Sequence, residues 1–155
     1  MEGACGRIVV LGDGRVRKVL KRRRRISLDA MEQVGMHLVG ADVCRLLGLA
    51  ILYVPSAWPE TPTQFTMEEI TTTHPIALPA IDHPCSRELG AWMCGMRARG
   101  VFPEDFELYQ QPDGRVALVD VDKFGTLKNG IITFPWGETM KEETLRPLYP
   151  ANWLS

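Results

Sequence analysis

The stretch of sequence that decides the fold is G-R-V-A-L-V-D-V-D-K-F-G, residues 114–125. It follows a turn signal, Pro112-Asp113-Gly114, whose residue types favour a tight reversal of the chain. A short run before the turn, Leu108 to Gln110, and the apolar run after it have the composition of two strands. We therefore predict a β-hairpin that ends in two carboxylates, Asp120 and Asp122.

A second hairpin is predicted at the N-terminus. The run R-I-V-V-L, residues 7–11, is rich in strand-forming residues and precedes Gly12-Asp13-Gly14, where glycine accepts the positive φ of a hairpin turn. Residues 16–20 then alternate apolar and basic side chains, as a half-buried strand does. Lys18 lies in this second strand, so we expect a hairpin with a basic outer face.

Two helices are predicted. Ser27 has the side chain of an N-cap, apolar residues follow at helical spacing, and Gly48 suits the C-terminal cap. This helix is expected to weaken at Gly35 and Gly40, because glycine is a poor helix former. The second helix, Asp82–Arg99, carries apolar residues at i, i+3, i+4 and i+7, which form one buried face.

The segments around these elements predict two more strands and two irregular regions. Residues 49–54 and 64–70 have the composition of strands. Residues 55–62 hold three prolines and are expected to be irregular. The chain after Gly125 is also expected to be irregular. It carries three aromatic residues that we expect to pack on the body of the protein, namely Phe134, Trp136 and Trp153.

The order of these elements predicts an α+β fold, because strands and helices come in groups and do not alternate. We expect one compact unit with three parts. Residues 1–70 form an N-terminal sheet with one helix, residues 71–82 form a proline-broken linker or hinge, and residues 83–155 hold the second helix, the late hairpin and the tail.

Composition indicates an ordinary globular domain. The chain has 155 residues, of which 45% are hydrophobic and 24% charged. No apolar run approaches the roughly 18 residues of a membrane span, and the first residues lack a signal-peptide pattern. A cytoplasmic or nuclear location without membrane contact is the expectation. The four cysteines lack zinc-ligand spacing and are expected to be reduced; they are Cys5, Cys44, Cys85 and Cys94.

The net charge of −1 is unevenly distributed. Residues 1–45 hold ten Lys/Arg against five Asp/Glu, with a basic run at Arg22–Arg25. Such a run can be a nuclear-import signal, a phosphate-binding patch or a solvated loop. Nucleic-acid binding through it is the weaker alternative, because no aromatic residues for base stacking are interleaved with the arginines.

The order of charged residues along these elements resembles that of the protein-kinase and aminoglycoside-phosphotransferase superfamily. Lys18 lies on a strand, Glu32 lies on the helix that follows, F-T-M-E-E-I (residues 65–70) forms a strand, and the hairpin of residues 114–125 comes last. The resemblance implies a minimal protein-kinase-like fold, with an antiparallel N-terminal sheet carrying one helix and a reduced helical C-terminal lobe.

The resemblance also implies roles for individual residues. Lys18 would hold the phosphates of ATP and pair with Glu32. The strand at 65–70 would lead into the hinge that contacts adenine, which makes Met67, Glu68 and Ile70 candidate nucleotide contacts. Asp120 would bind Mg²⁺, with Asp122 as a second candidate. These roles require Lys18 and Asp120 to line the same crevice.

The catalytic loop departs from the pattern of the family. The stretch where H-R-D-x-x-x-x-N is expected reads G-V-F-P-E-D-F-E, residues 100–107. Asp105 is the candidate base, but the metal-binding Asn position is then Gln110, and alignment by the hairpin places Glu107 there instead. The turn at Gly12-Asp13-Gly14 is also short for covering a triphosphate. The stretch after Asp120 is short for an activation segment and a helical lobe.

Three functions follow from this comparison. The first is a pseudokinase-like module that binds a protein partner and a nucleotide without efficient phosphotransfer. The second is a minimal ATP-dependent phosphotransferase that uses Asp105 and Asp120. The third is a structural or assembly protein that keeps only the fold. Loss of the base and of one metal ligand would remove much of the electrostatic stabilisation on which phosphoryl transfer depends, which favours the first.

Overall fold

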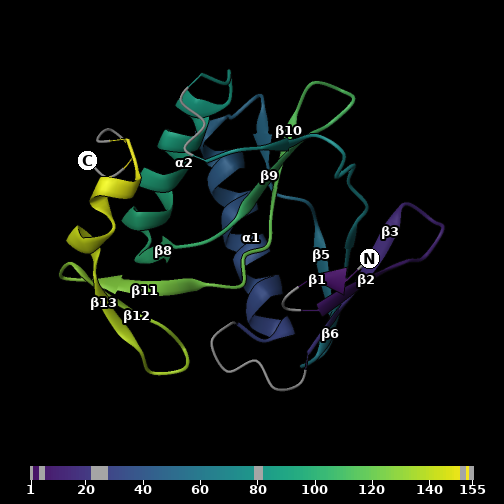
Figure 1. The fold of residues 1–155 in the computed structure, drawn as a ribbon, viewed down its shortest axis with the longest axis horizontal. Coiled ribbons are helices and arrows are strands. Elements are labelled where there is room, and N and C mark those ends of the chain that lie inside the picture. Colours follow the sequence, from purple (N-terminus) through teal and green to yellow (C-terminus); the bar gives the residue numbers. More distant parts are fainter. Residues whose placement is uncertain (1, 4–5, 22–27, 79–81, 151–152, 154–155) are drawn as a thin grey trace.

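The chain forms an α+β fold, in which the described residues make two α-helices and three β-sheets (Figure 1). The computed structural model describes residues 2–3, 6–21, 28–78, 82–150 and 153. The elements are β1 (Glu2–Gly3), β2 (Gly6–Val10), β3 (Arg15–Leu20), α1 (Ala30–Leu47), β4 (Leu52–Tyr53), β5 (Ala57–Thr61), β6 (Gln64–Glu68), β7 (Pro75–Ile76), α2 (Ser86–Ala98), β8 (Val101–Pro103), β9 (Glu107–Gln110), β10 (Val116–Val119), β11 (Phe124–Lys128), β12 (Ile131–Thr133), β13 (Thr139–Lys141) and the 3₁₀ turns η1 (Glu142–Thr144) and η2 (Arg146–Leu148).

The first sheet has the order β1-β2-β3-β6-β5 and is antiparallel throughout. The predicted β2–β3 hairpin is confirmed, with Gly12 and Gly14 at φ 82° and 81° in its turn. The prediction of an irregular segment at 55–62 is wrong, because β5 lies there. Proline is tolerated at Pro59 because β5 is an edge strand, and the register shifts between Pro59 and Thr61.

Helix α1 is continuous from Ala30 to Leu47. Its N-cap is Asp29, which forms a capping box with Glu32; Ser27, the predicted cap, lies outside the described residues. Gly48 ends the helix at φ 64°, as predicted. The helix does not weaken at Gly40, where the missing side chain lets Trp92 of α2 approach closely.

Helix α2 begins at Ser86, four residues after the predicted start at Asp82. Its end is as predicted, because Gly100 follows at φ 75° and reverses the chain into β8. The predicted apolar face is fully buried; it consists of Leu89, Trp92, Met93 and Met96.

The second sheet has the order β4-β10-β9-β7 and contains the predicted late hairpin, β9–β10. Strand β4 pairs in parallel with β10, and it is shorter than the predicted 49–54 strand. Strand β7 lies in the predicted linker 71–82 and pairs with β9, so part of that segment belongs to a sheet.

The third sheet, β13-β12-β11-β8, overturns the expectation of an irregular tail. Strands β11 and β12 are joined by Asn129-Gly130, both at positive φ, and this dipeptide is a strong hairpin signal that the sequence analysis missed. The expected helical C-terminal lobe is corrected by the same sheet. Within the described part of residues 83–155, α2 is the one α-helix, and it is accompanied by the six strands β8 to β13.

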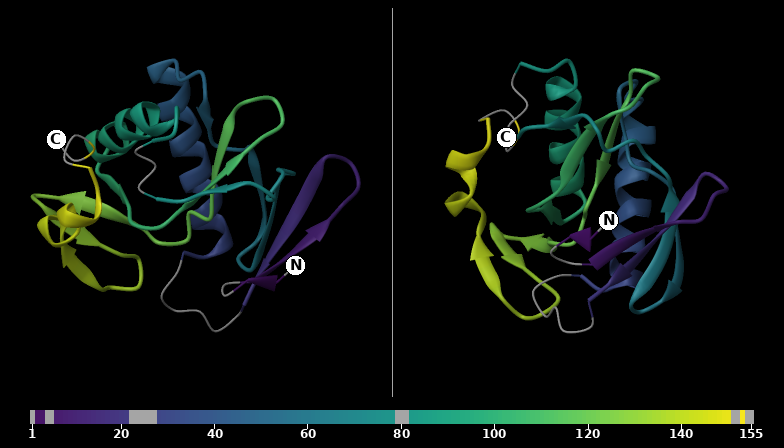
Figure 2. Two further views of the ribbon diagram at one scale, coloured as in Figure 1. Left: turned by 45° about the horizontal axis from the view of Figure 1, so that its top comes forward. Right: turned by 45° about the vertical axis from the view of Figure 1, so that its right-hand side comes forward.

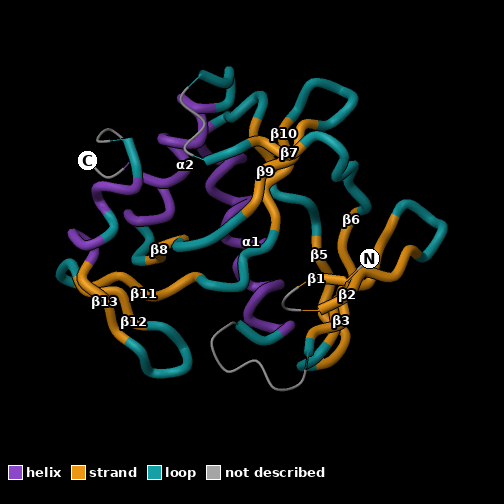
Figure 3. Tube along the Cα trace, viewed as in Figure 1, coloured by secondary structure: helices purple, strands orange, loops and turns teal. Residues whose placement is uncertain are grey.

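Helix α1 lies between the first sheet and α2 (Figures 1 and 2), and the tube view in Figure 3 separates the three groups of strands around it. One apolar cluster fills the space between α1 and the first sheet, and a larger one joins α1, α2 and the third sheet. Phe134 and Trp153 are buried in the larger cluster, and Trp136 stacks on Phe134 with ring centroids 4.7 Å apart. The expected packing of the tail through its aromatics is confirmed.

The expectations for the cysteines and for the basic run concern residues of which the structure describes only some. Cys44 and Cys85 are free thiols, and burial raises the pKa of Cys44 to about 12 and that of Cys85 to about 11. The basic run Arg22–Arg25 and Cys5 lie outside the described residues. Neither described helix combines the length and the apolar character that crossing a bilayer requires.

Candidate functional site

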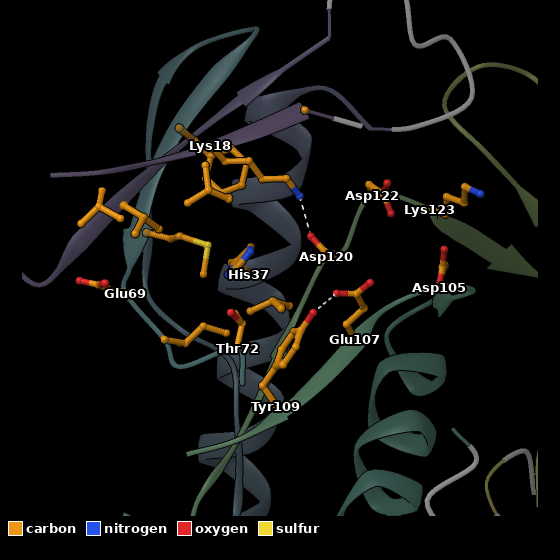
Figure 4. A pocket seen from close by; sticks show the side chains of 18 residues that line it. Lys18, His37, Glu69, Thr72, Asp105, Glu107, Tyr109, Asp120, Asp122 and Lys123 are labelled. Atoms are coloured by element: carbon orange, nitrogen blue, oxygen red, sulfur yellow. Dashed lines mark hydrogen bonds and ion pairs between the residues drawn. The ribbon is translucent and has the colours of Figure 1, made fainter. Parts of the chain in front are cut away.

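A cleft of about 520 Å³ lies between the first sheet and the β9–β10 hairpin (Figure 4). Its volume is typical of small-molecule sites. One part is lined by apolar side chains, and charged side chains gather in the other. The lining residues are Gly6, Ile8, Val10, Val16, Lys18, His37, Phe65, Met67, Glu69, Ile70, Thr72, Asp105, Glu107, Tyr109, Val119, Asp120, Asp122 and Lys123.

Strand alternation decides which predicted nucleotide contacts face the cleft. Side chains of β6 point alternately to the two faces of the sheet. Met67 lines the cleft, and Ile70, just beyond the strand, lines it too. Glu68 does not line it, because its carboxylate accepts a hydrogen bond from the Ser56 amide at 2.7 Å. A ligand contact at Glu68 stays a prediction, and the neighbouring Glu69 lines the cleft.

Lys18 and Asp120 meet inside the cleft. The Lys18 Nζ atom donates to Asp120 Oδ1 at 2.8 Å, across 102 positions of sequence (Figure 4). The Lys18 side chain is 9% exposed and that of Asp120 is 41% exposed, so the lysine of the pair is buried and the aspartate is partly exposed. The structure thus brings together the two residues whose convergence the resemblance requires.

Gln33 takes the place beside Lys18 that was expected for Glu32. The Glu32 carboxylate accepts from the Asp29 amide in the capping box, at the start of α1. The next residue, Gln33, is fully buried, with its Oε1 3.5 Å from Lys18 Nζ and its amide donating to Leu28 O. A neutral amide therefore lies where the family pattern has a carboxylate. Of Glu32, Gln33 and Asp120, only Asp120 forms an ion pair with Lys18.

The backbone at Asp120 is in the left-handed region, at φ 60°. Non-glycine residues rarely adopt this conformation, although Asp and Asn do so more readily than most. Val119 and Asp120 both line the cleft, which a regular strand does not allow for consecutive residues. The left-handed turn at the end of β10 thus brings the carboxylate into the cleft beside Lys18.

A chain of hydrogen bonds runs from β9 to this ion pair. The Tyr109 hydroxyl donates to Glu107 at 2.5 Å (Figure 4). Glu107 is in turn hydrogen-bonded to Asp120. The bond to Asp120 and partial burial raise the pKa of Glu107 to about 7, while Lys18 counteracts burial and lowers the pKa of Asp120. Glu107 therefore gains and loses a proton near neutral pH, beside an ionised Asp120.

Replacing Glu107 by glutamine should flatten the dependence of stability on pH. The folded-state pKa of about 7 lies above the ordinary 4.5, so the protonated carboxyl stabilises the fold. That contribution is complete below about pH 4.5 and is lost as the pH rises through 7. Melting temperatures of wild type and Glu107→Gln between pH 4.5 and 8 test this. Glu143→Gln, at an exposed position of η1, should keep the wild-type profile.

The predicted catalytic and metal-binding carboxylates gather at the same end of the cleft. Asp105 lies in the loop between β8 and β9, and burial together with Asp122 raises its pKa. Asp122 is 7% exposed and also lines the cleft. Among the described residues, no three His, Cys, Asp or Glu side chains are arranged to hold a metal ion on their own.

This arrangement still fits a magnesium ion that arrives with phosphates. Mg²⁺ is commonly held by one or two carboxylates together with substrate phosphate oxygens, and a complete protein cage is not needed. Asp120 and Asp122 supply two carboxylates that line the cleft. The chemistry of the donors therefore suits Mg²⁺ bound as a nucleotide complex.

Sequence reasoning missed several residues of the cleft. His37 follows Gln33 by one helical turn, so both lie on the buried face of α1. Tyr109 and Glu107 are two apart on β9 and face the same side of the sheet. These periodicities were available in the sequence, but which face meets the cleft depends on contacts between distant segments.

Comparison with known proteins does not assign a family to the chain. No protein-family model, curated protein or solved structure matches it significantly. The function is therefore inferred from the geometry and chemistry of the cleft.

Proposed function

We propose that the protein is a kinase-like binding module that holds a nucleotide with Mg²⁺ in this cleft and does not transfer its phosphate efficiently. The observation that carries the proposal is the ion pair between Lys18 and Asp120, which joins the opening hairpin to the late hairpin within one cleft. The resemblance in element order and the shape of the cleft support the same function.

The apolar part of the cleft suits a flat ring. Val16 and Met67 are directly opposite each other on β3 and β6, and Val119 lies on β10 of the other wall. All three are buried. Burial of ring surface between these side chains would supply most of the affinity for the base, because apolar burial is favourable in proportion to area.

The charged part of the cleft suits a phosphate group only together with a cation. Its two lysines, Lys18 and Lys123, face a group of carboxylates that includes Asp105, Asp120 and Asp122. A free triphosphate would be repelled by this excess of negative charge. Asp120 and Asp122 would hold Mg²⁺, whose charge would offset that of the phosphates, and Lys18 would contact a phosphate oxygen.

Efficient phosphotransfer is not expected from this cleft. The turn between β2 and β3 is closed by a hydrogen bond from Leu11 N to Arg15 O, so there is no long loop to cover a triphosphate. The metal-binding Asn position of the family falls on Gln110 or, if aligned by the late hairpin, on Glu107, whose pKa is raised to about 7 by Asp120 and burial. Positioning and charge stabilisation supply most of the catalysis in phosphoryl transfer, so these losses are serious.

A second candidate, a minimal phosphotransferase, is favoured by one observation. Asp105 lies in the same cleft as Asp120, and its raised pKa suits a proton acceptor. Transfer from γ-labelled ATP, measured with and without Asp105→Asn, separates the candidates. We expect no labelled product above background, and product that depends on Asp105 would establish the enzyme instead.

Nucleotide binding should depend on Lys18. We expect Mg²⁺·ATP to raise the melting temperature of the wild type, and Lys18→Met to weaken binding about 10- to 100-fold, because it removes a charged hydrogen-bond donor. Differential scanning fluorimetry and calorimetric titration measure these effects. Arg17→Met is the matched control, since Arg17 lies on the same strand but pairs with Glu60 outside the cleft. No shift with wild type at millimolar Mg²⁺·ATP, or equal affinity for Lys18→Met, would refute the proposal.

Binding of a protein partner belongs to the same proposal. A pseudokinase-like module acts by presenting a surface whose shape depends on cleft occupancy. Two of the tail aromatics, Phe134 and Trp153, do not supply that surface, because they are buried within the molecule.

A further inference from the structure

His37 is a polar side chain that lines the cleft, and it has no role in the charged cluster described above. It lies on α1, one turn after Gln33, and lines the cleft while only 2% exposed. Its ring meets Phe65 edge-on, with ring centroids 5.9 Å apart. Figure 4 shows it among the cleft side chains, near the Lys18–Asp120 pair.

The hydrogen bond on one side of the ring fixes its chemistry on the other side. His37 Nδ1 lies 2.9 Å from the carbonyl oxygen of Pro55. A carbonyl only accepts, so Nδ1 carries the hydrogen. Burial, together with the nearby Lys18, lowers the pKa of His37, so the ring is neutral at physiological pH. Nε2 is therefore an unprotonated hydrogen-bond acceptor.

This acceptor opens onto the cleft. No described residue donates a hydrogen bond to Nε2. Among the described residues, no polar side-chain atom shut off from the surface lacks a partner, so Nε2 keeps access to the space that His37 lines. A nearly buried acceptor without a donor is costly unless water or a ligand supplies one.

We propose that His37 Nε2 accepts a hydrogen bond from the nucleoside part of the ligand, and so selects ligands that carry an N–H or O–H donor at that point. This inference rests on the proposed function and names a contact within it. Phosphate oxygens, which at neutral pH act as acceptors, do not bond to an acceptor, so the group at Nε2 belongs to the base or the ribose. An exocyclic amino group and a ribose hydroxyl are the two donors of a nucleoside that can reach it.

The experiment combines ligand analogues with a substitution that isolates Nε2. His37→Asn keeps a donor for the Pro55 carbonyl, because the Asn amide corresponds to Nδ1, and it removes the Nε2 acceptor. Affinities of wild type and variant are measured for Mg²⁺·ATP and for analogues lacking the amino group, the 2′-hydroxyl or the 3′-hydroxyl. We expect one analogue to bind wild type about tenfold more weakly than ATP, and this difference to vanish in His37→Asn.

The outcomes separate this inference from the proposed function. If ATP binds and every analogue binds wild type equally well, the role of His37 is overturned while nucleotide binding stands. The same holds if the analogue difference persists in His37→Asn. If neither ATP nor adenosine binds wild type, the proposed function fails and the inference fails with it. Should the variant not fold, the ¹⁵N resonance of Nε2 in wild type decides: a shift on addition of adenosine supports the contact, and an unchanged resonance refutes it.

Discussion

Replacing Trp92 by alanine should lower the free energy of unfolding by about 3–5 kcal/mol, because the change leaves a large cavity in the core. Trp92 is 0% exposed. Its ring lies against Phe106 and Phe124, at centroid distances of 5.6 and 6.2 Å. Its indole Nε1 donates to Gly40 O at 3.1 Å. One side chain therefore joins both helices to the strands and loop that follow α2.

Urea unfolding of the variant and of two controls tests this expectation. Trp92→Phe keeps much of the ring and loses the hydrogen bond to Gly40, so it should cost about 1–2 kcal/mol for the lost hydrogen bond and the smaller side chain. Trp58→Ala, at a side chain that is 43% exposed, should cost less than about 1 kcal/mol. A loss below about 1 kcal/mol for Trp92→Ala would contradict the role of this contact.

Replacing Arg97 by alanine should cost a similar amount, about 3–5 kcal/mol, because it strips a buried carboxylate of its main partner. Arg97 Nε and Nη2 donate to both oxygens of Glu142, and the two side chains are 17% and 7% exposed. The remaining cation, Arg146, lies 3.5 Å from Glu142 with a side chain that is 52% exposed. The pair joins α2 to η1, which directly follows strand β13 of the third sheet.

A double-mutant cycle distinguishes the pair from simple loss of packing. Arg97→Met with Glu142→Leu should be more stable than Arg97→Ala alone, because apolar replacements of both partners leave no buried charge unpaired. Arg45→Ala is the exposed control, since its pair with Asp42 has side chains 70% and 60% exposed and should contribute less than about 1 kcal/mol. Equal losses for Arg97→Ala and Arg45→Ala would contradict the prediction.

Many residues of the candidate site could be predicted from the sequence, but which of their side chains pair with one another could not. Lys18, Asp105, Met67, Ile70, Asp120 and Asp122 were predicted, and all six line the cleft. Glu32 and Glu68 do not line the cleft, and the reason is the same for both. Each is one residue away from a side chain that faces the cleft or Lys18, and a shift of one residue turns the side chain elsewhere on a helix or a strand. The neighbours that take their places are Gln33 and Glu69.

The sequence by itself determined the features that depend on a few adjacent residues. The β2–β3 and β9–β10 hairpins follow from their glycine-containing turns, and the ends of both helices follow from Gly48 and Gly100 at positive φ. The turn at Asn129-Gly130 belongs to the same class, although its signal was overlooked. In each case the permitted backbone angles of the residues at the turn or cap set the structure.

Only the tertiary structure decided which segments meet. Pro59 is accommodated because no described strand pairs with the outer side of β5, and that depends on the order of strands in the sheet. Lys18 and Asp120 form an ion pair although they are 102 positions apart in the sequence. The ring of His37 is oriented in the cleft by a hydrogen bond from its Nδ1 to the carbonyl oxygen of Pro55. Such contacts arise from burial of apolar faces contributed by distant segments, and no local pattern of residues specifies them.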